Sequence, residues 1–375
     1  MAIAPVGADQ ALNITVTIEA GAATSNQIGY PCLIYDDTGD RFTIYANTAA
    51  IDAAETAGTL TSAAAAALRT GFAQLAPVPA GVVAIRYDST AGSPETPIIG
   101  LEDAISDGLD VGGVVLLSGT ETAQETLAGW FAADQQRIGR YLFFVQSNDT
   151  GLYGGSKPAS LDACELSNVR MLYASDDTRY VAFAALCRAC AKPLVGTATG
   201  NVQTNPSPAG AFPNIRGVTA ETALTAGNIS NLTTNDVGFL QPFDHGADST
   251  ENNISGSPNM YDGSDFATAV SAIFASRQIR AVLGALWQRY ADAGASIPAN
   301  SVGIAICESA VVPVLDEMAA AGHFTLTDPD YPGGYTIVGS IITVSGNQRV
   351  QLAITLATPG GIAGITVPVV ASEVS

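Results

Sequence analysis

Side chains able to carry out acid–base chemistry are few in this sequence. The 375-residue chain has only two histidines, and histidine is the usual general base of enzymes. His245 lies beside Asp244 in a loop-rich stretch, which favours a position on a surface loop. His323 follows Gly322 at the end of a predicted helix, where an imidazole commonly caps backbone carbonyls. We therefore expect neither histidine to be catalytic.

Closely spaced carboxylates are the next candidates, because they can share a proton or bind a divalent ion. Such pairs stand at Asp36–Asp37, Asp176–Asp177, Asp316–Glu317 and Asp328–Asp330. Adjacent carboxylates in turns are more often caps or solvated loop residues. Asp328-Pro-Asp330 is the pair most suited to a divalent ion, and we expect no ion there.

The five cysteines form an odd set: Cys32, Cys164, Cys187, Cys190 and Cys307. No secretion signal is visible, so we expect buried thiols. Cys187 and Cys190 form a C-x-x-C, but within the predicted helix 180–192 this spacing simply puts both on one face. A zinc site would need more ligands nearby. We predict no metal and no cofactor, and disulfides between subunits of an assembly stay open as an alternative.

Motifs for nucleotide binding or nucleophilic catalysis are also missing. Neither a P-loop nor G-x-G-x-x-G follows a predicted strand, and Gly112-Gly113 and Gly154-Gly155 are typical of turns. No G-x-S-x-G elbow occurs, and Ser156-Lys157 lies in a Gly/Pro loop without a base beside it. The sequence therefore predicts a protein that is not an enzyme.

Composition points to a large, weakly charged surface. Hydrophobic residues make up 47% of the chain and charged residues 13%, with a formal net charge of −20. The only lysines are Lys157 and Lys192, so no basic patch could neutralise a phosphate backbone. No signal peptide or membrane-spanning stretch is visible. We expect a chain made and assembled in a cytoplasm, without direct nucleic-acid contact or membrane insertion.

Strands and helices alternate from residue 30 to residue 191, which predicts an α/β fold with a largely parallel sheet. The predicted strands are 31–35, 41–45, 82–87, 113–117, 141–146 and 170–173, with the first two forming a hairpin. The predicted helices are 61–74, 101–109, 122–137 and 179–191. Residues 197–260 are rich in Gly, Asn, Pro, Ser and Thr, and this composition predicts long loops and a domain crossover.

The C-terminal part has its own set of elements, which predicts a separate α+β domain. Its predicted elements are a long amphipathic helix 265–291, a strand 302–306, a helix 309–321, a hairpin of 335–345 with 348–356, and a last strand 362–370. The first strand of the chain, residues 12–18, alternates apolar and polar side chains. A linker of small residues, 21–26, separates it from the rest.

These patterns divide the chain into four parts. An N-terminal strand arm and linker occupy residues 1–26, and an outer α/β part with the crossover at about 197–260 occupies residues 27–260. An inner α/β domain occupies residues 261–358, and a C-terminal strand arm occupies 359–375.

The order of these segments resembles the contractile tail sheath family of myophages and related injection machines. Four stretches carry the resemblance: the helix, proline turn and strand of 67–86; the helix–strand–helix–strand unit of 101–149; the segment 212–236; and Asp262-Gly263 before the long helix, followed by Ile297-Pro298, Gly303-Ile304 and the closing strands. No single motif is diagnostic. The chain departs from larger members in lacking an obvious outer insertion, so we expect a compact subunit.

The resemblance implies a virion structural protein without enzymatic activity. Such a subunit polymerises helically around a tail tube, meets baseplate and tail terminator proteins, and contracts to drive the tube through the host envelope. The terminal arms of sheath proteins donate strands to neighbouring subunits. The candidate arm residues here are Leu12, Ile14, Val16, Ile18, Ile362, Ile365, Val367 and Val369.

The resemblance also implies that the inner domain contacts the tail tube. We place that surface on the predicted helix 309–321 and its flanking loop, with Glu308, Asp316 and Glu317 as candidate contacts. A solvated helix face explains the same carboxylates, and the terminal strands could equally be edge strands of the chain's own sheet.

Two other classes of protein stay open as alternatives. An S-layer or adhesin-like lattice protein would suit the low lysine and abundant Thr, Ala and Gly, although the absence of a signal peptide counts against it. An α/β enzyme with a site built from distant carboxylates is the other.

Overall fold

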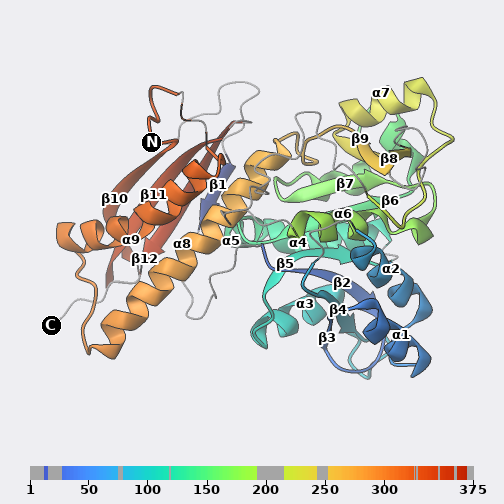
Figure 1. Ribbon diagram of the computed structural model, residues 1–375, viewed down its shortest axis with the longest axis horizontal. Helices are drawn as coiled ribbons and strands as arrows, with labels where there is room; N and C mark the ends of the chain where they lie inside the picture. Colours follow the sequence, from blue (N-terminus) through green and yellow to red (C-terminus); the bar gives the residue numbers. More distant parts are fainter. Residues whose placement is uncertain are drawn as a thin grey trace.

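The computed structural model describes residues 12–15, 28–74, 79–117, 120–191, 215–242, 252–324, 326, 328–344, 347–358 and 361–369. Two sheets organise these residues, one of eight strands and one of four, and the long helix α8 runs between them (Figure 1). We call them the large sheet and the small sheet. The α/β class expected from the alternation of strands and helices is confirmed.

The large sheet has the strand order β3-β4-β2-β5-β6-β7-β8-β9. Its strands are β2 (Tyr30–Asp36), β3 (Phe42–Tyr45), β4 (Val82–Tyr87), β5 (Val111–Leu116), β6 (Leu142–Ser147), β7 (Val169–Tyr173), β8 (Val237–Pro242) and β9 (Asn252–Gly256). The six inner strands run parallel, and only the edge strands β3 and β9 are antiparallel to their neighbours. Strands β4, β5 and β7 are nearly continuous runs of buried residues, as expected for a parallel sheet covered on both faces.

Helices cover both faces of the large sheet. One face carries α1 (Thr48–Thr56), α2 (Ser62–Phe72) and α6 (Val181–Ala191), and the other carries α3 (Pro97–Ser106), α4 (Glu121–Ala132) and α7 (Ala226–Thr234). The short helix α5 (Gln135–Ile138) follows α4, and the 3-10 turns are η1 (Thr150–Tyr153), η2 (Ala159–Cys164) and η3 (Asp177–Arg179). Each face buries its own apolar cluster.

Local sequence explains where the helices begin. Thr61, Thr96, Thr120 and Thr225 precede α2, α3, α4 and α7, and each hydroxyl accepts a hydrogen bond from a first-turn amide. Such caps satisfy amides that have no partner inside the helix. Gly71 of α2 has a packing role, because it lies close to the Cys187 sulfur of α6 and a side chain there would collide with it.

Helix α8 (Phe266–Asp292) joins the two sheets. Its cap Asp265 accepts hydrogen bonds from the amide and hydroxyl of Thr268. Phe266 packs edge-on against Phe144 of β6, while other residues of α8 lie against the small sheet. Arg277 donates to the Val111 carbonyl at 2.8 Å and pairs with Asp110. The apolar cluster on this side of the large sheet therefore continues through α8 into the small sheet.

The small sheet has the order β1-β12-β11-β10 and carries helix α9 (Ser301–Ala320) on one face. Its strands are β1 (Leu12–Thr15), β10 (Tyr335–Val344), β11 (Asn347–Thr358) and β12 (Gly361–Val369). The predicted hairpin of β10 and β11 is confirmed. Val350, Leu352, Ile354 and Leu356 of β11 alternate as buried residues, so this sheet has one face towards the helices and one away from them.

The predicted pairing of the first two strands of the large sheet is wrong. Residues 30–36 and 42–45 do form strands, but β3 pairs with β4, and β2 lies between β4 and β5. The physical reason is burial: β2 is buried almost along its whole length, so it occupies an interior position, whereas β3 exposes Ile44 and takes the edge.

The predicted strand 302–306 is also wrong, because these residues form the first turns of α9. The side chain of Asn300 accepts hydrogen bonds from Val302 and Gly303 and starts the helix there. The residues that α9 buries recur at helical spacing: Gly303, Cys307, Val311, Leu315 and Met318. Packing against the small sheet overrides the strand preference of the Val-Gly-Ile-Ala-Ile run.

Three further differences concern helices. Helix α1 has no counterpart in the sequence prediction, and the segment expected to be mostly loop holds α7, β8 and β9. Among the described residues, α8 meets the length and hydropathy criteria of a membrane span, contrary to the expectation that no stretch would. Two thirds of that window, 67%, is buried inside the protein, as in the core helix of a globular fold.

Candidate assembly surface

The small sheet is the region where both ends of the described chain meet. Strand β12 pairs with β11 in antiparallel register, and β1 pairs with β12 in parallel register. Leu12 and Ile14 stand opposite Ala363 and Ile365. The single chain thus completes its small sheet with its own first and last strands, and this agrees with the alternative in which they belong to the chain's own sheet.

The candidate residues of the C-terminal arm all occupy register positions opposite buried residues of β11. Ile362 pairs with Ala357, Ile365 with Ile354, Val367 with Leu352 and Val369 with Val350. A strand that replaced β12 would stand opposite the same buried residues of β11. The remaining arm candidates, Val16 and Ile18, lie outside the described residues.

The face of the small sheet turned away from α9 is open. It presents Val338, Ser340 and Ile342 from β10 and Arg349, Gln351 and Ala353 from β11, and we call these six residues the open face. Val338 is 63% exposed. Arg349 is the only charged residue within the described bounds of the four strands. Natural sheets usually protect exposed strands with charges or prolines, and β10, at the edge, has neither.

Helix α9 forms the other side of this region and carries the three candidate tube contacts. Glu308 is half-buried across from Gly339 of β10, whereas Asp316 and Glu317 are exposed. The Tyr335 hydroxyl donates a 2.7 Å hydrogen bond to Asp316. Burial, together with this bond, raises the pKa of Tyr335 to about 12. The contact ties α9 to β10, so Asp316 has a structural partner within the chain, and the bond leaves its second oxygen available.

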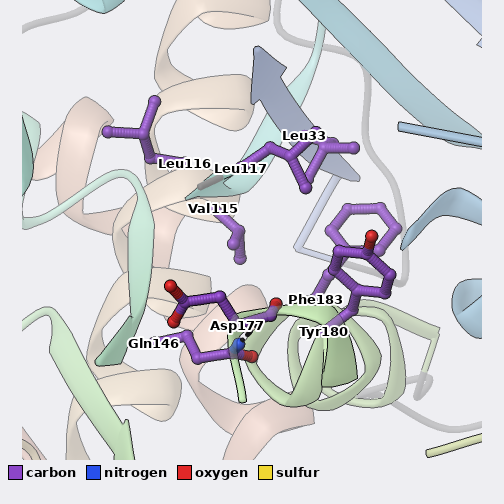
Figure 2. Close-up of a pocket in the computed structure, with 8 residues that line it drawn as sticks. All are labelled: Leu33, Val115, Leu116, Leu117, Gln146, Asp177, Tyr180 and Phe183. Atoms are coloured by element: carbon purple, nitrogen blue, oxygen red, sulfur yellow. Dashed lines mark hydrogen bonds between the residues drawn. The ribbon is translucent and has the colours of Figure 1, made fainter. Parts of the chain in front are cut away.

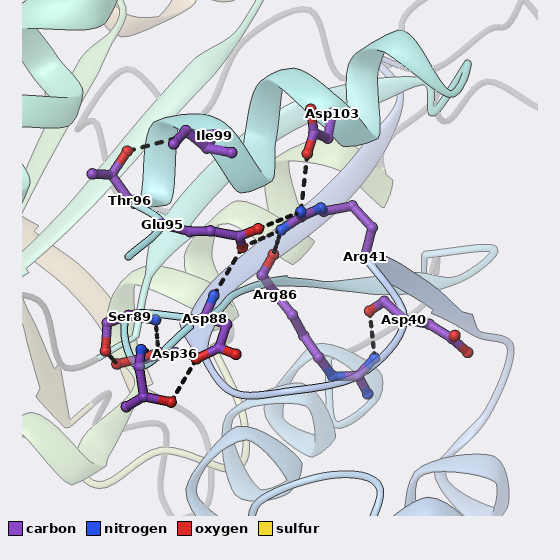
Figure 3. Close-up of polar contacts among 11 residues, drawn as sticks. Asp36, Asp40, Arg41, Arg86, Asp88, Ser89, Glu95, Thr96, Ile99 and Asp103 are labelled. Atoms are coloured by element: carbon purple, nitrogen blue, oxygen red, sulfur yellow. Dashed lines mark hydrogen bonds and ion pairs between the residues drawn. The ribbon is translucent and has the colours of Figure 1, made fainter. Parts of the chain in front are cut away.

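Cations of the large-sheet region are held within the subunit. Arg41, Arg69, Arg137, Lys157 and Arg179 form ion pairs with carboxylates. Figure 3 shows that both terminal nitrogens of Arg41 donate hydrogen bonds to the Glu95 carboxylate, and that Arg41 also forms an ion pair with Asp103. Hydrogen bonds from Arg41 and from the Asp88 amide lower the pKa of Glu95 to about 2. These ion pairs connect parts of the same subunit. Because carboxylates outnumber cations in the chain, further carboxylates have no cation to pair with.

Arg86 and Arg170 are buried and donate hydrogen bonds to backbone carbonyls. Arg86 donates to the Tyr35 hydroxyl and to the carbonyls of Asp40 and Thr59. Arg170 is 1% exposed and donates to the carbonyls of Ser257 and Asn259, and burial lowers its pKa to about 10. Backbone carbonyls thus take the place of carboxylates as partners. Through these hydrogen bonds Arg86 fixes neighbouring loops to β4, and Arg170 fixes a loop to β7.

The residues considered for catalysis or metal binding do not lie together in the structure. The His323 ring is buried and shares a hydrogen bond with Ser271 of α8, so it does not simply cap the end of α9 as expected. His245 lies outside the described residues. Asp328 accepts from the Asp330 amide as an ordinary turn. Within the described ranges no cluster of three or more metal-ligating side chains is found.

The five cysteines are free and buried, as expected. Burial raises the pKa of Cys164 to about 12 and that of Cys307 to about 11, so both are protonated thiols at neutral pH. Cys187 and Cys190 lie in α6, whose residues are all buried.

The position where open α/β sheets usually bind ligands is nearly filled. That position is the carboxyl edge of two strands whose connections run in opposite directions, here β2 and β5. Figure 2 shows the cavity there, lined by side chains that include Leu33, Gln146, Asp177 and Phe183. Its volume of about 20 Å³ is room for about one water molecule. A nucleotide does not fit into a space of this size.

Two solved structures that match this arrangement are sheath proteins. The first is the helical sheath of the anti-feeding prophage in its contracted state, which aligns with a TM-score of 0.55 and 14% identity over 96% of this chain and 94% of that one. The fold is that of a contractile tail sheath protein.

A second sheath-fold match is the sheath tail protein Lin1278 from Listeria innocua. It aligns with a TM-score of 0.51 and 12% identity, covering 78% of this chain and 62% of that longer chain. No family model and no curated protein matches the sequence. The matched chains are named for a structural role, in agreement with the expectation that the chain is not an enzyme.

Sequence reasoning found the strands of the small sheet but not the features that make it a candidate surface. The lone charge at Arg349 could have been noticed from the sequence, because the predicted strands 335–345, 348–356 and 362–370 contain no other charged residue. The open face itself could not have been noticed, because it depends on α9 covering only one side.

Proposed function

We propose that this protein is the structural subunit of a contractile tail sheath, polymerising helically around a tail tube in a phage tail or tail-like particle. The observation that supports this most strongly is the alignment of its fold with a helical sheath over nearly the full length of both chains. Contraction, in this proposal, drives the tube through the host envelope. It needs no cofactor, because an extended lattice held in a metastable state releases its free energy through new subunit contacts.

Strand exchange is the proposed link between subunits. β1 joins the small sheet as its terminal strand, and β12 lies directly next to it. A neighbouring copy can supply strands of identical sequence to these positions, with the same main-chain hydrogen bonds. The linkers at 21–26 and 359–361 would then act as hinges while subunits rotate. Support for this comes from the nearly uncharged composition of the four strands, and a neighbouring copy would reproduce the β1–β12 ladder seen within one chain.

The tail tube is the proposed partner of α9. Glu308, Asp316 and Glu317 lie on a helix without lysine or arginine, so a tube surface that carries cations would complement it. The ends of the polymer would meet the baseplate and the tail terminator protein.

Electron microscopy of two truncations tests the proposal. Removal of residues 1–20 deletes β1, whereas removal of residues 1–10 leaves Leu12–Thr15 in place and serves as the matched control. We expect tubes or rings from the full chain and from the shorter truncation, and monomers from the longer one. Flat lattices in place of tubes, or no assembly of the full chain at any salt concentration, would overturn the proposal.

A further inference from the structure

The two sides of the small-sheet region differ in charge. Helix α9 carries three carboxylates and no cation. The open face carries Arg349 and no carboxylate. This contrast is unusual in a chain where carboxylates outnumber cations by more than two to one. The two sides therefore fit partners of opposite charge.

Arg349 is distinctive among the cations of this protein. In the part of the chain that the structure describes, the side chains of Arg289 and Arg349 are the two cationic ones without a hydrogen bond, ion pair or ring contact. Arg289 is exposed in the last turn of α8. Arg349 lies on the open face, opposite Ile342 of β10, and is held in position by a regular strand.

The open face also leaves apolar surface in water. Val338 is its most exposed large side chain, and Ile342 and Ala353 add further apolar atoms around it. Protein interfaces combine such apolar contacts with hydrogen bonds. Its neutral side chains, Ser340 and Gln351, can donate and accept hydrogen bonds across such a contact.

We propose that the open face docks against an acidic surface of a second copy of this chain, with Arg349 as the charged contact and Val338 as the main apolar contact. Charge complementarity supports this partner, because the large-sheet region of a neighbour exposes Asp40 and Asp107, two carboxylates that take no part in the ion pairs of that region. The contact joins two different surfaces, and a heterologous contact of this kind builds open helical polymers. The inference rests on the proposed sheath function.

Charge reversal with a matched control tests the docking. Arg349→Glu should raise the critical concentration for assembly by about tenfold, and Arg349→Lys should restore it to near the wild-type value. Arg289→Glu makes the same change in net charge at an exposed, unpaired arginine of α8 and should have little effect. Turbidity and sedimentation measure the critical concentration, and thermal unfolding of the monomers checks that each variant is folded.

A second pair of variants tests the apolar part. Val338→Glu should block assembly, whereas Val302→Glu, at a valine 57% exposed on α9, should leave contacts between copies in place. Equal effects of the two arginine reversals, or normal assembly of both Arg349→Glu and Val338→Glu, would overturn the inference while leaving the sheath function intact. Failure of the wild-type chain to assemble would instead overturn the proposed function.

Discussion

The large sheet and the small sheet differ in how far helices cover them and in how their charged groups are paired. The large sheet is covered by helices on both faces, and its cations are paired or buried within the subunit. The small sheet is covered on one face, holds one charge in four strands, and takes in the first and last strands of the described chain. The comparison teaches that the large sheet satisfies its charged groups within the subunit, whereas the small sheet leaves an open face and an unpaired Arg349, which the proposed sheath function would use for contacts with a neighbour.

Truncation of Phe131 should have the largest effect on the stability of the large-sheet region. Phe131 is fully buried and stacks on Phe143, with ring centroids 5.4 Å apart. Phe131→Ala should lower the free energy of unfolding by about 3–5 kcal/mol, as measured by urea denaturation of the monomer. If the loss matches that of an exposed substitution such as Ile99→Ala, the large sheet is not the self-contained core described above.

Loss of the polar contact between α8 and the large sheet should have the second-largest effect on stability. Arg277→Ala removes the hydrogen bond from α8 to the Val111 carbonyl and the pair with Asp110, which should cost about 1.5–3 kcal/mol. Hydrogen exchange should show faster opening of α8 and of the start of β5. Arg277→Lys, which keeps the charge, should lose less. An unchanged exchange pattern would show that apolar packing alone joins the two regions.

The contact between α9 and the small sheet should be weaker. Tyr335→Phe removes the hydrogen bond to Asp316 and should lower the free energy of unfolding by about 1 kcal/mol. The double variant with Asp316→Asn should lose little more than Tyr335→Phe alone, because the two changes remove one interaction. Additive losses would mean that Asp316 stabilises α9 in another way.

The smallest effect concerns pH and the edge of the large sheet. Because the folded pKa of Glu95, about 2, lies below the unfolded value of about 4.3, its ionised form stabilises the fold at neutral pH. This contribution is lost as the pH falls from about 4.3 towards 2. Glu95→Gln should flatten that part of the stability profile from acid denaturation series. A profile that is unchanged by the substitution would show that the Arg41–Glu95 pair does not stabilise the fold.

The sequence predicted most elements of the fold because burial and period agree there. Strands β4, β5 and β7 are short apolar runs, and α8 repeats apolar residues at helical spacing, so each has a clear local signal. The wrong predictions concern segments whose structure depends on tertiary packing. Residues 302–306 look like a strand by composition and become helical because α9 must cover the small sheet. The order of β2, β3 and β4 depends on which strand is buried, and the hairpin prediction could not include that.

The candidate surface was predictable only in part. The terminal strands could be proposed because their alternation is visible in Leu12 to Ile18 and in Ile362 to Val369. Their partners could not, because pairing of β1 with β12 joins residues at opposite ends of the chain and leaves no local pattern. The free state of Arg349 depends on the absence of nearby carboxylates in three dimensions, which spacing along the chain does not report.

The parallel pairing of β1 with β12 also has a mechanical consequence. Four residue pairs join Leu12–Thr15 to Ala363–Thr366, and both strands run in the same direction, so the two chain ends leave this ladder from opposite ends. Tension applied to the two ends slides the strands past each other and loads their hydrogen bonds together. Antiparallel partners pulled from one end would separate one bond at a time. A joint of this geometry resists pulling far better than its short length implies.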